Sequence, residues 1–194
     1  PQQVISALDT LVQEDPETTV VTGVGQHQMW AAQFLSFNHE NTFVSSGGLG
    51  AMGFELPAAL GVQVAKPGTP VWCVAGDGGF QMTVQELGTI FQAKIPVKMM
   101  ILNNEYLGMV RQWQQLFFSR RYSATELMNP DFVAGAAAYG MEGTRVDQRA
   151  QLGEAIDRML GAESSFLLEV AVEREDNVFP MVPSGAACSE IRLE

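Results

Sequence analysis

The sequence predicts an α/β domain with a doubly wound, mainly parallel sheet and helices on both faces. Apolar runs rich in β-branched residues alternate with longer segments whose apolar residues recur with the period of a helix. Several of the runs are apolar throughout, as expected of parallel strands that are covered on both faces. Parallel strands need crossover helices between them, and the alternation supplies these helices.

The first part of the chain starts with helical spacing and then alternates. The apolar residues near the N-terminus recur as in an amphipathic helix and lack the pattern of a signal peptide: Val4, Ile5, Leu8, Leu11 and Val12. Apolar runs predict strands at 18–23, 42–46 and 71–76. Helical spacing predicts helices at 26–37 and 53–65, each after a strand.

The second part of the chain continues the alternation. Strands are predicted at 97–103 and 165–172, and helices at 81–93, 107–118, 130–139 and 147–160. In the segment 107–118, Val110, Trp113 and Phe117 follow one helical face. With no internal repeat or low-complexity linker, residues 1–194 are expected to form a single domain.

Composition restricts the class of partner. The chain has 46% hydrophobic residues and a formal charge of −11, from 22 acidic and 11 basic residues. This charge opposes nucleic acid and anionic lipid surfaces, so neither a nucleic acid nor a membrane is an expected partner. No run approaches the roughly 18 apolar residues of a membrane span. Cys73 and Cys188 are expected to be buried free thiols in a reducing compartment.

Glycine-rich or polar segments follow four of the five predicted strands. In open α/β sheets, ligands bind outside the carboxyl ends of the strands, so these segments predict a ligand site at one edge. The segments are GVGQHQ (23–28), SSGGLGAMG (45–53), GDGGF (76–80) and NNEYLGM (103–109).

Asp77 lies between a strand and a helix, where backbone amides favour an anion such as a diphosphate. A bare carboxylate would repel that anion, so a cation between them is implied. Mg²⁺ prefers oxygen ligands, and it is typically held by one or two protein groups together with phosphate oxygens. Asn103 and Asn104 end the next strand and should emerge beside Asp77.

Two other interpretations compete with the metal site. Asp77 can cap a helix while Asn103 and Asn104 form a turn, because Asp, Asn and Gly are common turn residues. Alternatively, GVGQHQ begins like a nicotinamide-binding fingerprint. However, its third glycine is missing, and no acidic residue closes a second strand about 20 residues further on.

The motif GDGGFQMTVQEL, followed by ILNNEYLGM, resembles the diphosphate and magnesium motif of thiamine-diphosphate-dependent enzymes. Further segments are similar to the catalytic subunits of the acetohydroxyacid synthase family, also called acetolactate synthases. These segments are GVGQHQMWAAQF, SSGGLGAMGFELPAALG, LGMVRQWQQLFF, NPDFVAGAAAYG and VFPMVPSGAA, and together the resemblance covers nearly the whole chain.

The resemblance implies roles for individual residues. Asp77, Asn104 and the main-chain carbonyl of Tyr106 would hold Mg²⁺. The Gly50 carbonyl and the Met52 side chain would act on the aminopyrimidine half of thiamine diphosphate and fix its bent shape. Nine residues would lie near the diphosphate: Val24, Gly25, Gln26, His27, Gly78, Gly79, Gly108, Met109 and Val110.

The resemblance also implies an activity. The family decarboxylates pyruvate and joins the two-carbon unit to a second 2-ketoacid in branched-chain amino-acid biosynthesis. Trp113 would line the access channel, where the second substrate is selected and herbicides bind; the alternative is that Trp113 is a core residue. The family occurs in the bacterial cytoplasm and the plastid stroma.

The chain resembles only the C-terminal domain of such enzymes. The pyrimidine-binding domain, with its activating glutamate, and the middle FAD domain have no counterpart here. We therefore expect half a cofactor site that is completed by another subunit of a homo-oligomer, possible contact with a regulatory subunit, and no activity of the chain alone. Glu55 stands where relatives usually carry glycine, and it begins a predicted helix.

Two further alternatives stay open. The chain can belong to another carboligase or decarboxylase of the same superfamily, such as glyoxylate carboligase, sulfoacetaldehyde acetyltransferase or pyruvate oxidase. It can also be a non-catalytic assembly module. Product analysis separates the enzymes from one another, and restoration of carboligation by the missing domains separates the enzymes from the module.

Overall fold

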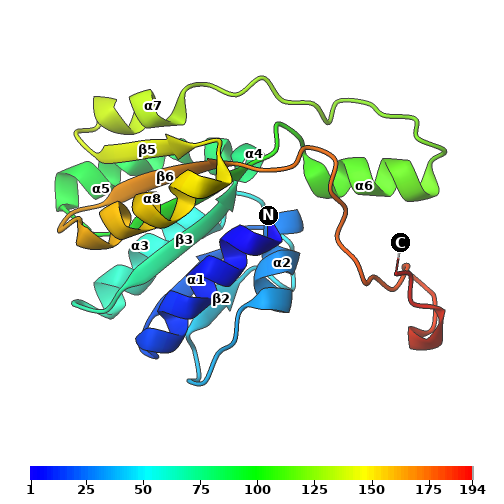
Figure 1. Cartoon of the computed structure of the whole chain (residues 1–194), viewed down its shortest axis with the longest axis horizontal. Coiled ribbons are helices and arrows are strands. Elements are labelled where there is room, and N and C mark those ends of the chain that lie inside the picture. The colour runs from blue at the N-terminus through cyan, green and yellow to red at the C-terminus, as the bar shows by residue number, and fades with distance from the viewer. Residues whose placement is uncertain (194) are drawn as a thin grey trace.

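The computed structural model describes residues 1–193 and contains a six-stranded sheet in the order β2-β1-β3-β4-β6-β5 (Figure 1). All neighbouring strands are parallel, which confirms the predicted fold class. The strands are β1 (Thr19–Thr22), β2 (Phe43–Ser45), β3 (Val71–Gly76), β4 (Lys98–Asn103), β5 (Glu142–Val146) and β6 (Phe166–Ala171).

Helices cover both faces of the sheet. One face packs against α1 (Gln2–Glu14), α2 (Gln26–Phe34) and α8 (Leu152–Gly161). The other packs against α3 (Glu55–Ala65), α4 (Asp77–Met82), α5 (Leu87–Ala93) and α7 (Phe132–Ala138). Helix α6 (Gly108–Phe117) extends away from the sheet, on the right of Figure 1. Short 3₁₀ segments are η1 (Val84–Glu86), η2 (Arg149–Gln151) and η3 (Cys188–Glu190).

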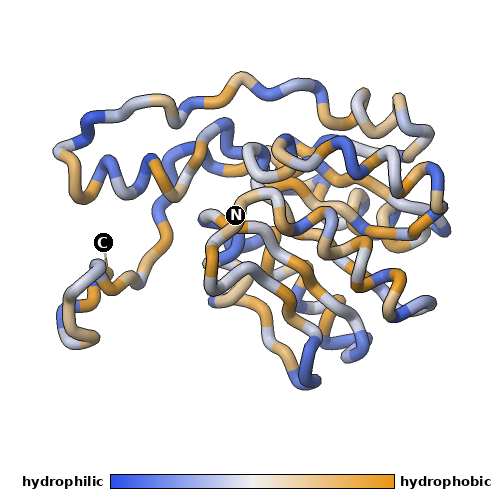
Figure 2. The backbone as a smooth tube through the Cα atoms, turned by 180° about the vertical axis from the view of Figure 1, so that it is seen from behind, coloured by the Kyte–Doolittle hydropathy of each residue, from blue (hydrophilic) through white to orange (hydrophobic). Residues whose placement is uncertain are grey.

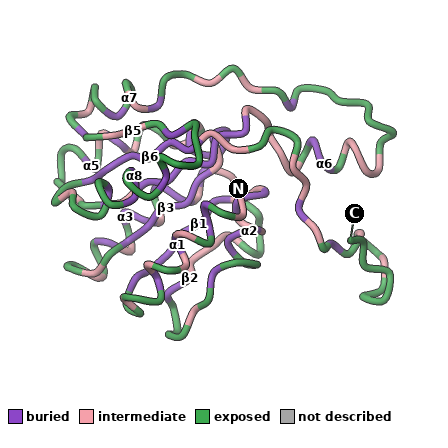
Figure 3. Tube along the Cα trace, in the orientation of Figure 1, coloured by how far each residue is buried: buried purple, intermediate pink, exposed green. Residues whose placement is uncertain are grey.

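Alternating side chains of the central strands build two cores. In β3, Trp72 and Val74 join the core under α1, α2 and α8, while Cys73 and Ala75 join the core on the opposite face. Figure 2 shows many apolar segments within the body of the domain, and Figure 3 shows that β3 and β6 are buried along most of their length. Full burial of one large aliphatic side chain contributes about 1.5–3 kcal/mol, which explains why these strands are apolar on both faces.

The chain leaves β1 towards β2 on one side and returns to β3 on the other. This reversal opens a crevice at the carboxyl ends of β1 and β3, where α/β proteins bind their ligands. The register aligns the next loop with it. Gly76 pairs with Leu102, so Asp77 and Asn103 emerge at the same level of the sheet.

Three sequence-based expectations were wrong in part. The strand β5 was not predicted, because this edge strand has only one buried residue, Val146, and so lacks a clear apolar pattern. The single helix expected at 81–93 is interrupted at Thr83, and its first piece, α4, already begins at Asp77. Both cysteines are free as expected, but only Cys73 is buried, since Cys188 lies in the exposed C-terminal segment.

Within residues 1–193, every helix is too short or too polar to cross a membrane.

Candidate functional site

A cavity of about 190 Å³ lies at the carboxyl ends of β1, β3 and β4, at the crevice that the strand order creates. The loops after these strands and the loop after β2 form its wall. Fourteen of the fifteen residues to which the family resemblance assigns roles line this one cavity: Val24, Gly25, Gln26, His27, Gly50, Met52, Asp77, Gly78, Gly79, Asn104, Tyr106, Gly108, Met109 and Val110.

Asp77 is the first residue of α4, and its carboxylate is almost completely buried. Burial raises the pKa of Asp77 to about 6, although a hydrogen bond from the side chain of Asn129 opposes the shift. The amide nitrogen of Asn129 donates to Oδ2 of Asp77 at 2.7 Å. A cation beside this carboxylate would favour its charged form, because opposite charges within about 4–6 Å stabilise each other.

Asn104 presents a defined amide to the site. Its Oδ1 accepts a hydrogen bond from the Tyr106 backbone N–H at 3.2 Å, and its Nδ2 donates to Oε1 of Gln26 at 3.3 Å. Glu105 between them has a φ of +57°, a left-handed conformation that is uncommon for a residue with a side chain. This tight turn places residues 104–106 at the wall of the cavity.

The neighbouring Asn103 has a different place from Asn104. It does not line the cavity; its Nδ2 donates to the buried Glu169 of β6 at 2.8 Å. Its Oδ1 accepts from the Glu105 backbone N–H and from Nδ2 of Asn129. The asparagine pair therefore divides into one residue at the cavity and one that holds the loop from behind.

Sequence reasoning missed Asn129, which links Asp77 to Asn103. It is delivered by the segment after α6, which folds back on the loop after β4 through the backbone bonds of Leu107 with Thr125 and of Leu127 with Glu105. Asn129 opens the segment NPDFVAGAAAYG, which resembles the family, but that resemblance assigned it no role.

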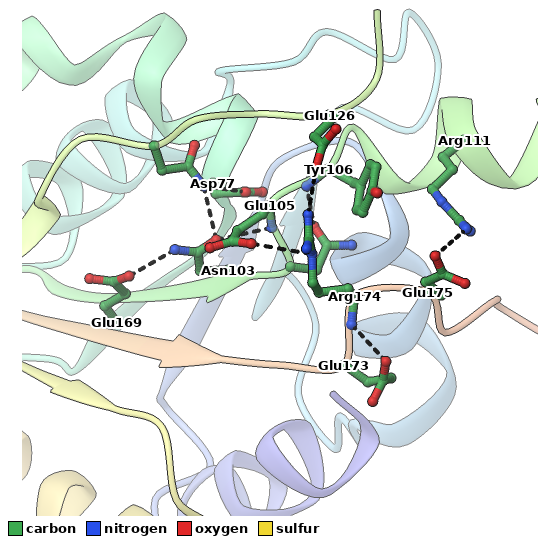
Figure 4. Close-up of polar contacts among 12 residues, drawn as sticks. Asp77, Asn103, Glu105, Tyr106, Arg111, Glu126, Glu169, Glu173, Arg174 and Glu175 are labelled. Carbon is green, nitrogen blue, oxygen red and sulfur yellow. Dashed lines mark hydrogen bonds and ion pairs between the residues drawn. The ribbon is translucent and has the colours of Figure 1, made fainter. Parts of the chain in front are cut away.

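Two arginines clamp the side chain of Tyr106. Arg111 lies on one side and Arg174 on the other, each guanidinium about 5 Å from the ring centre. Figure 4 shows Arg174 between the carboxylates of Glu105 and Glu126, which it contacts at 3.2 and 2.9 Å. These contacts bind the loop after β4 to the segment after β6.

Glycines at the cavity are required by close approach. A Cβ atom at Gly78 would lie 2.6 Å from a methyl carbon of Leu107, and one at Gly76 would lie 2.8 Å from Nδ1 of His27. Real Cβ atoms do not approach other groups so closely, so side chains at these positions would displace the wall. Their absence lets a ligand approach the backbone amides at the start of α4.

His27 lines the cavity and is 5% exposed. Burial lowers the pKa of His27 to about 4, so its imidazole is neutral at pH 7. Its Nε2 finds no hydrogen-bond partner among residues 1–193. A buried polar atom without a partner is costly, so His27 is suited to hydrogen-bond a ligand in the cavity rather than to carry a charge.

The loop after β2 brings Gly50 and Met52 to the same cavity. Gly50 has a φ of +66°, which favours glycine, and its N–H donates to the Ser46 carbonyl. Trp113 is the one of these fifteen residues that lies outside the cavity. It is 36% exposed, packs against Phe117 with ring centres 4.9 Å apart, and lines an adjacent surface hollow. Trp113 is therefore not a core residue.

Glu55 does begin α3, as expected, but its carboxyl group is fully buried between Gly23 at the end of β1 and Gly79 of α4. Neither carboxyl oxygen has a hydrogen-bond partner in the described part of the chain. Burial raises the pKa of Glu55 to about 7. A Cβ atom at Gly79 would lie 2.6 Å from Oε1 of Glu55, so the carboxyl lies directly behind the cavity wall.

The residues at the cavity fit a magnesium diphosphate. Asp77 and Asn104 offer the oxygen ligands that Mg²⁺ prefers, Tyr106 lines the cavity with them, and the start of α6 provides backbone N–H groups that have no partner within the helix. No group of three or more His, Cys, Asp or Glu residues is arranged to hold a metal within residues 1–193. A cation here therefore needs amide, carbonyl and ligand oxygens in addition to Asp77.

A known protein family matches the region of the chain that contains the cavity. The family described as "Thiamine pyrophosphate enzyme, C-terminal TPP binding domain" matches residues 23–170, which is more than half of the chain. This match includes all the loops of the cavity except the last residue of its wall, Val172.

Individual relatives are similar over nearly the whole chain. The acetolactate synthase isozyme 2 large subunit of Escherichia coli K12 is 50% identical over 90% of the chain. The mitochondrial acetolactate synthase catalytic subunit of Saccharomyces cerevisiae is 47% identical over 98%, and the chloroplastic acetolactate synthase 2 of Brassica napus is 44% identical over 98%. The chain spans about a third of the length of these relatives, at 32%, 28% and 31% respectively.

Proposed function

Because this chain belongs to the family of C-terminal TPP-binding domains of thiamine pyrophosphate enzymes, we propose that it is the diphosphate- and Mg²⁺-binding domain of an acetolactate synthase. The whole enzyme would decarboxylate pyruvate and transfer the two-carbon unit to a second 2-ketoacid in branched-chain amino-acid biosynthesis. The names of the relatives favour this activity over the other carboligases of the superfamily and over a nicotinamide-binding domain.

The observation that carries the proposal is the convergence of two loops, those after β3 and β4, on one cavity. Asp77, Asn104 and Tyr106, whose main-chain carbonyl is the group proposed to bind the metal, line it together, although 27 positions separate the first two in the sequence. In the proposal these three groups hold Mg²⁺. The amides of Gly78 and Gly108, with the neutral His27, then bind the diphosphate oxygens.

The other residues at the cavity orient the rest of the cofactor. Thiamine diphosphate, when bound, stabilises the negative charge left when a 2-ketoacid loses carbon dioxide. The Gly50 carbonyl would accept a hydrogen bond from the aminopyrimidine, and Met52 would support the bent shape of the cofactor. Trp113, beside the cavity on the partly exposed face of α6, would contact the second 2-ketoacid and herbicides.

The site is proposed to be half of a complete one. The pyrimidine-binding domain of another subunit would supply the activating glutamate, and a middle domain would hold most of the FAD. The chain alone would then be inactive. The whole enzyme would be a homo-oligomer that can also bind a regulatory subunit. For its compartment we propose the bacterial cytoplasm or the plastid stroma, while the mitochondrial relatives add a third setting within the family.

Calorimetry tests the cofactor site directly. Thiamine diphosphate is titrated into the chain up to millimolar concentration, first with Mg²⁺ and then with EDTA. We expect binding only with Mg²⁺, lost in Asp77→Ala and retained in Asp157→Ala, whose carboxylate is exposed on α8. Binding that ignores Mg²⁺, or no binding at all, would contradict a preformed metal and diphosphate half-site.

Reconstitution tests the activity. The chain is mixed with a polypeptide that carries the pyrimidine-binding and FAD domains of an acetolactate synthase, and acetolactate is measured. We expect no product from the chain alone and product from the mixture. Turnover by the chain alone would refute the half-site, and a mixture without product would favour a non-catalytic assembly module.

A further inference from the structure

Two buried glutamines connect the segment after β6 with the wall of the cavity. Gln112 of α6 is 1% exposed, and its amide is bonded on both sides to the backbone of Val178. The Val178 N–H donates to Oε1 of Gln112 at 2.8 Å, and Nε2 of Gln112 donates to the Val178 carbonyl at 2.9 Å. Gln26 then donates from Nε2 to Oε1 of Gln112 at 3.0 Å and to the Asp176 carbonyl at 2.8 Å.

The chain of amides ends at Asn104. Nδ2 of Asn104 donates to Oε1 of Gln26, which is the remaining polar atom of that glutamine. Gly108 lies under this contact. A Cβ atom there would overlap Oε1 of Gln26 and would lie 2.7 Å from Nδ2 of Asn104. The two side chains therefore meet in a space that only a glycine leaves open.

The direction of each amide follows from its partners. Oxygen and nitrogen of an amide have nearly the same shape, so hydrogen bonds decide which end lies where. The backbone N–H and carbonyl of Val178 cannot exchange roles, so Gln112 has one favourable orientation. In that orientation Oε1 of Gln112 accepts a hydrogen bond from Nε2 of Gln26. The other end of the Gln26 amide, Oε1, therefore faces Asn104.

The result at Asn104 is an oxygen left for a cation. With Nδ2 bound to Gln26, Oδ1 lies on the other side of the amide and accepts one bond, from the Tyr106 N–H. An amide oxygen has two lone pairs, so one lone pair is still free. Mg²⁺ requires oxygen ligands, so an Asn104 amide turned the other way would offer it a nitrogen and bind it poorly.

We propose that Gln112 is a positioning residue for the metal site. Gln112 fixes the Asn104 amide through Gln26, and it thereby couples docking of residues 176–178 to the affinity for Mg²⁺. The proposal rests on the proposed function, which makes Asn104 a metal ligand. Gln112 does not line the cavity, so any effect on the metal passes through other side chains.

The test compares Mg²⁺ dependence with cofactor affinity. Gln112→Met keeps a similar shape but removes both the donor and the acceptor. The Mg²⁺ concentration that gives half-maximal thiamine diphosphate binding is measured by calorimetry. We expect it to rise about five- to tenfold, the effect of one or two lost hydrogen bonds. Affinity for thiamine diphosphate at saturating Mg²⁺ should stay within about twofold, since Gln112 does not line the cavity.

A matched control is a second glutamine of α2 that also contacts the segment after β6. Gln33, like Gln26, belongs to α2, and it donates to the Phe179 carbonyl at 3.4 Å from an exposed position. It has no bond to Asn104 or Gln112. Gln33→Met should therefore leave the half-maximal Mg²⁺ concentration unchanged, and an equal rise in this control would overturn the specific role of Gln112.

A double-mutant cycle distinguishes the relay from general destabilisation. Once Gln26→Met has broken the link to Asn104, adding Gln112→Met should change the half-maximal Mg²⁺ concentration by less than about twofold. Additive effects would mean that Gln112 acts by another route and would overturn the proposal. If Gln112→Met does not fold, a chain ending at Glu175 breaks the same bonds from the other side, by removing the Val178 backbone, and it also removes the Asp176 carbonyl that Gln26 contacts, so it should show at least the same rise.

The outcomes separate this inference from the proposed function. Mg²⁺-dependent binding by the wild-type chain with an unchanged Gln112→Met overturns the inference alone. Binding by the wild-type chain that ignores Mg²⁺, or no binding at all, overturns the proposed metal site and the inference with it.

Discussion

Replacement of Glu55 with glutamine should remove a large part of the pH dependence of folding. The carboxyl of Glu55 is fully buried without a hydrogen-bond partner among the described residues, and burial raises its pKa from 4.5 to about 7. In the unfolded chain the group is solvated and has its ordinary pKa. Between pH 4.5 and 7 the folded state therefore binds more protons than the unfolded state.

The sign and size follow from proton linkage. Stability falls with rising pH wherever the folded state holds the extra proton, so the Glu55 contribution decreases from about pH 4.5 to pH 7 and is constant above. One pKa unit corresponds to about 1.4 kcal/mol, so a shift of this size costs the folded state roughly 3 kcal/mol at pH 8 relative to pH 4.5. This is a substantial part of the stability of a typical domain.

The assay is urea unfolding at several pH values between 4.5 and 8 for the wild-type chain and Glu55→Gln, followed by tryptophan fluorescence from the buried Trp30 and Trp72. Other groups also titrate. Asp77, with a raised pKa, acts in the same direction, whereas His27, with a lowered pKa, makes stability rise with pH. The difference between the two chains at each pH cancels these contributions.

The free energy of unfolding of the wild type minus that of Glu55→Gln should fall by about 3 kcal/mol from pH 4.5 to pH 8. A difference that stays constant within about 1 kcal/mol would show that the Glu55 carboxyl is hydrated or paired in the folded chain, and that its burial has no energetic consequence.

Two further predictions concern the cavity wall. Asn129→Ala removes the hydrogen bond to Asp77 and should raise the half-maximal Mg²⁺ concentration for cofactor binding about tenfold. The loss of Mg²⁺ affinity should be larger at pH 6, because more Asp77 is protonated there. An unchanged titration would mean that Asp77 does not need the hydrogen bond from Asn129. Gly108→Ala would overlap Gln26 and should lower the free energy of unfolding by about 1–3 kcal/mol. The control Gly153→Ala, in an open position on α8, should instead raise it by up to about 1 kcal/mol, and equal effects in urea unfolding would contradict the close approach at Gly108.

Local pattern was enough to predict the class of fold and the place of the cavity. Four of the five predicted runs form the strands β1, β3, β4 and β6, which are buried along nearly their whole length, and β3 has the predicted bounds of 71–76. Parallel strands bring their carboxyl ends to one edge, so Asp77 and Asn104 meet although they are far apart in the sequence. Their convergence follows from topology and needs no knowledge of side-chain contacts.

The features that the sequence left open depend on long-range packing. The edge strand β5 takes its conformation from pairing with β6, since its own residues are mostly not buried. Asn129 reaches Asp77 only because the segment after α6 folds back across 52 positions, and the glutamine relay joins residues up to 150 positions apart. Such contacts produce no periodic pattern in the local sequence, so they could not be predicted from it.

Glu55 shows the division most clearly. The sequence determined that a carboxylate begins α3, where its charge is favourable beside the helix N-terminus. Only the tertiary structure decided that the carboxyl lies buried between Gly23 and Gly79 without a partner among the described residues, because those glycines come from other segments of the chain and leave space for it. Burial depends on what packs around a residue, and the sequence of the residue's own segment does not specify it.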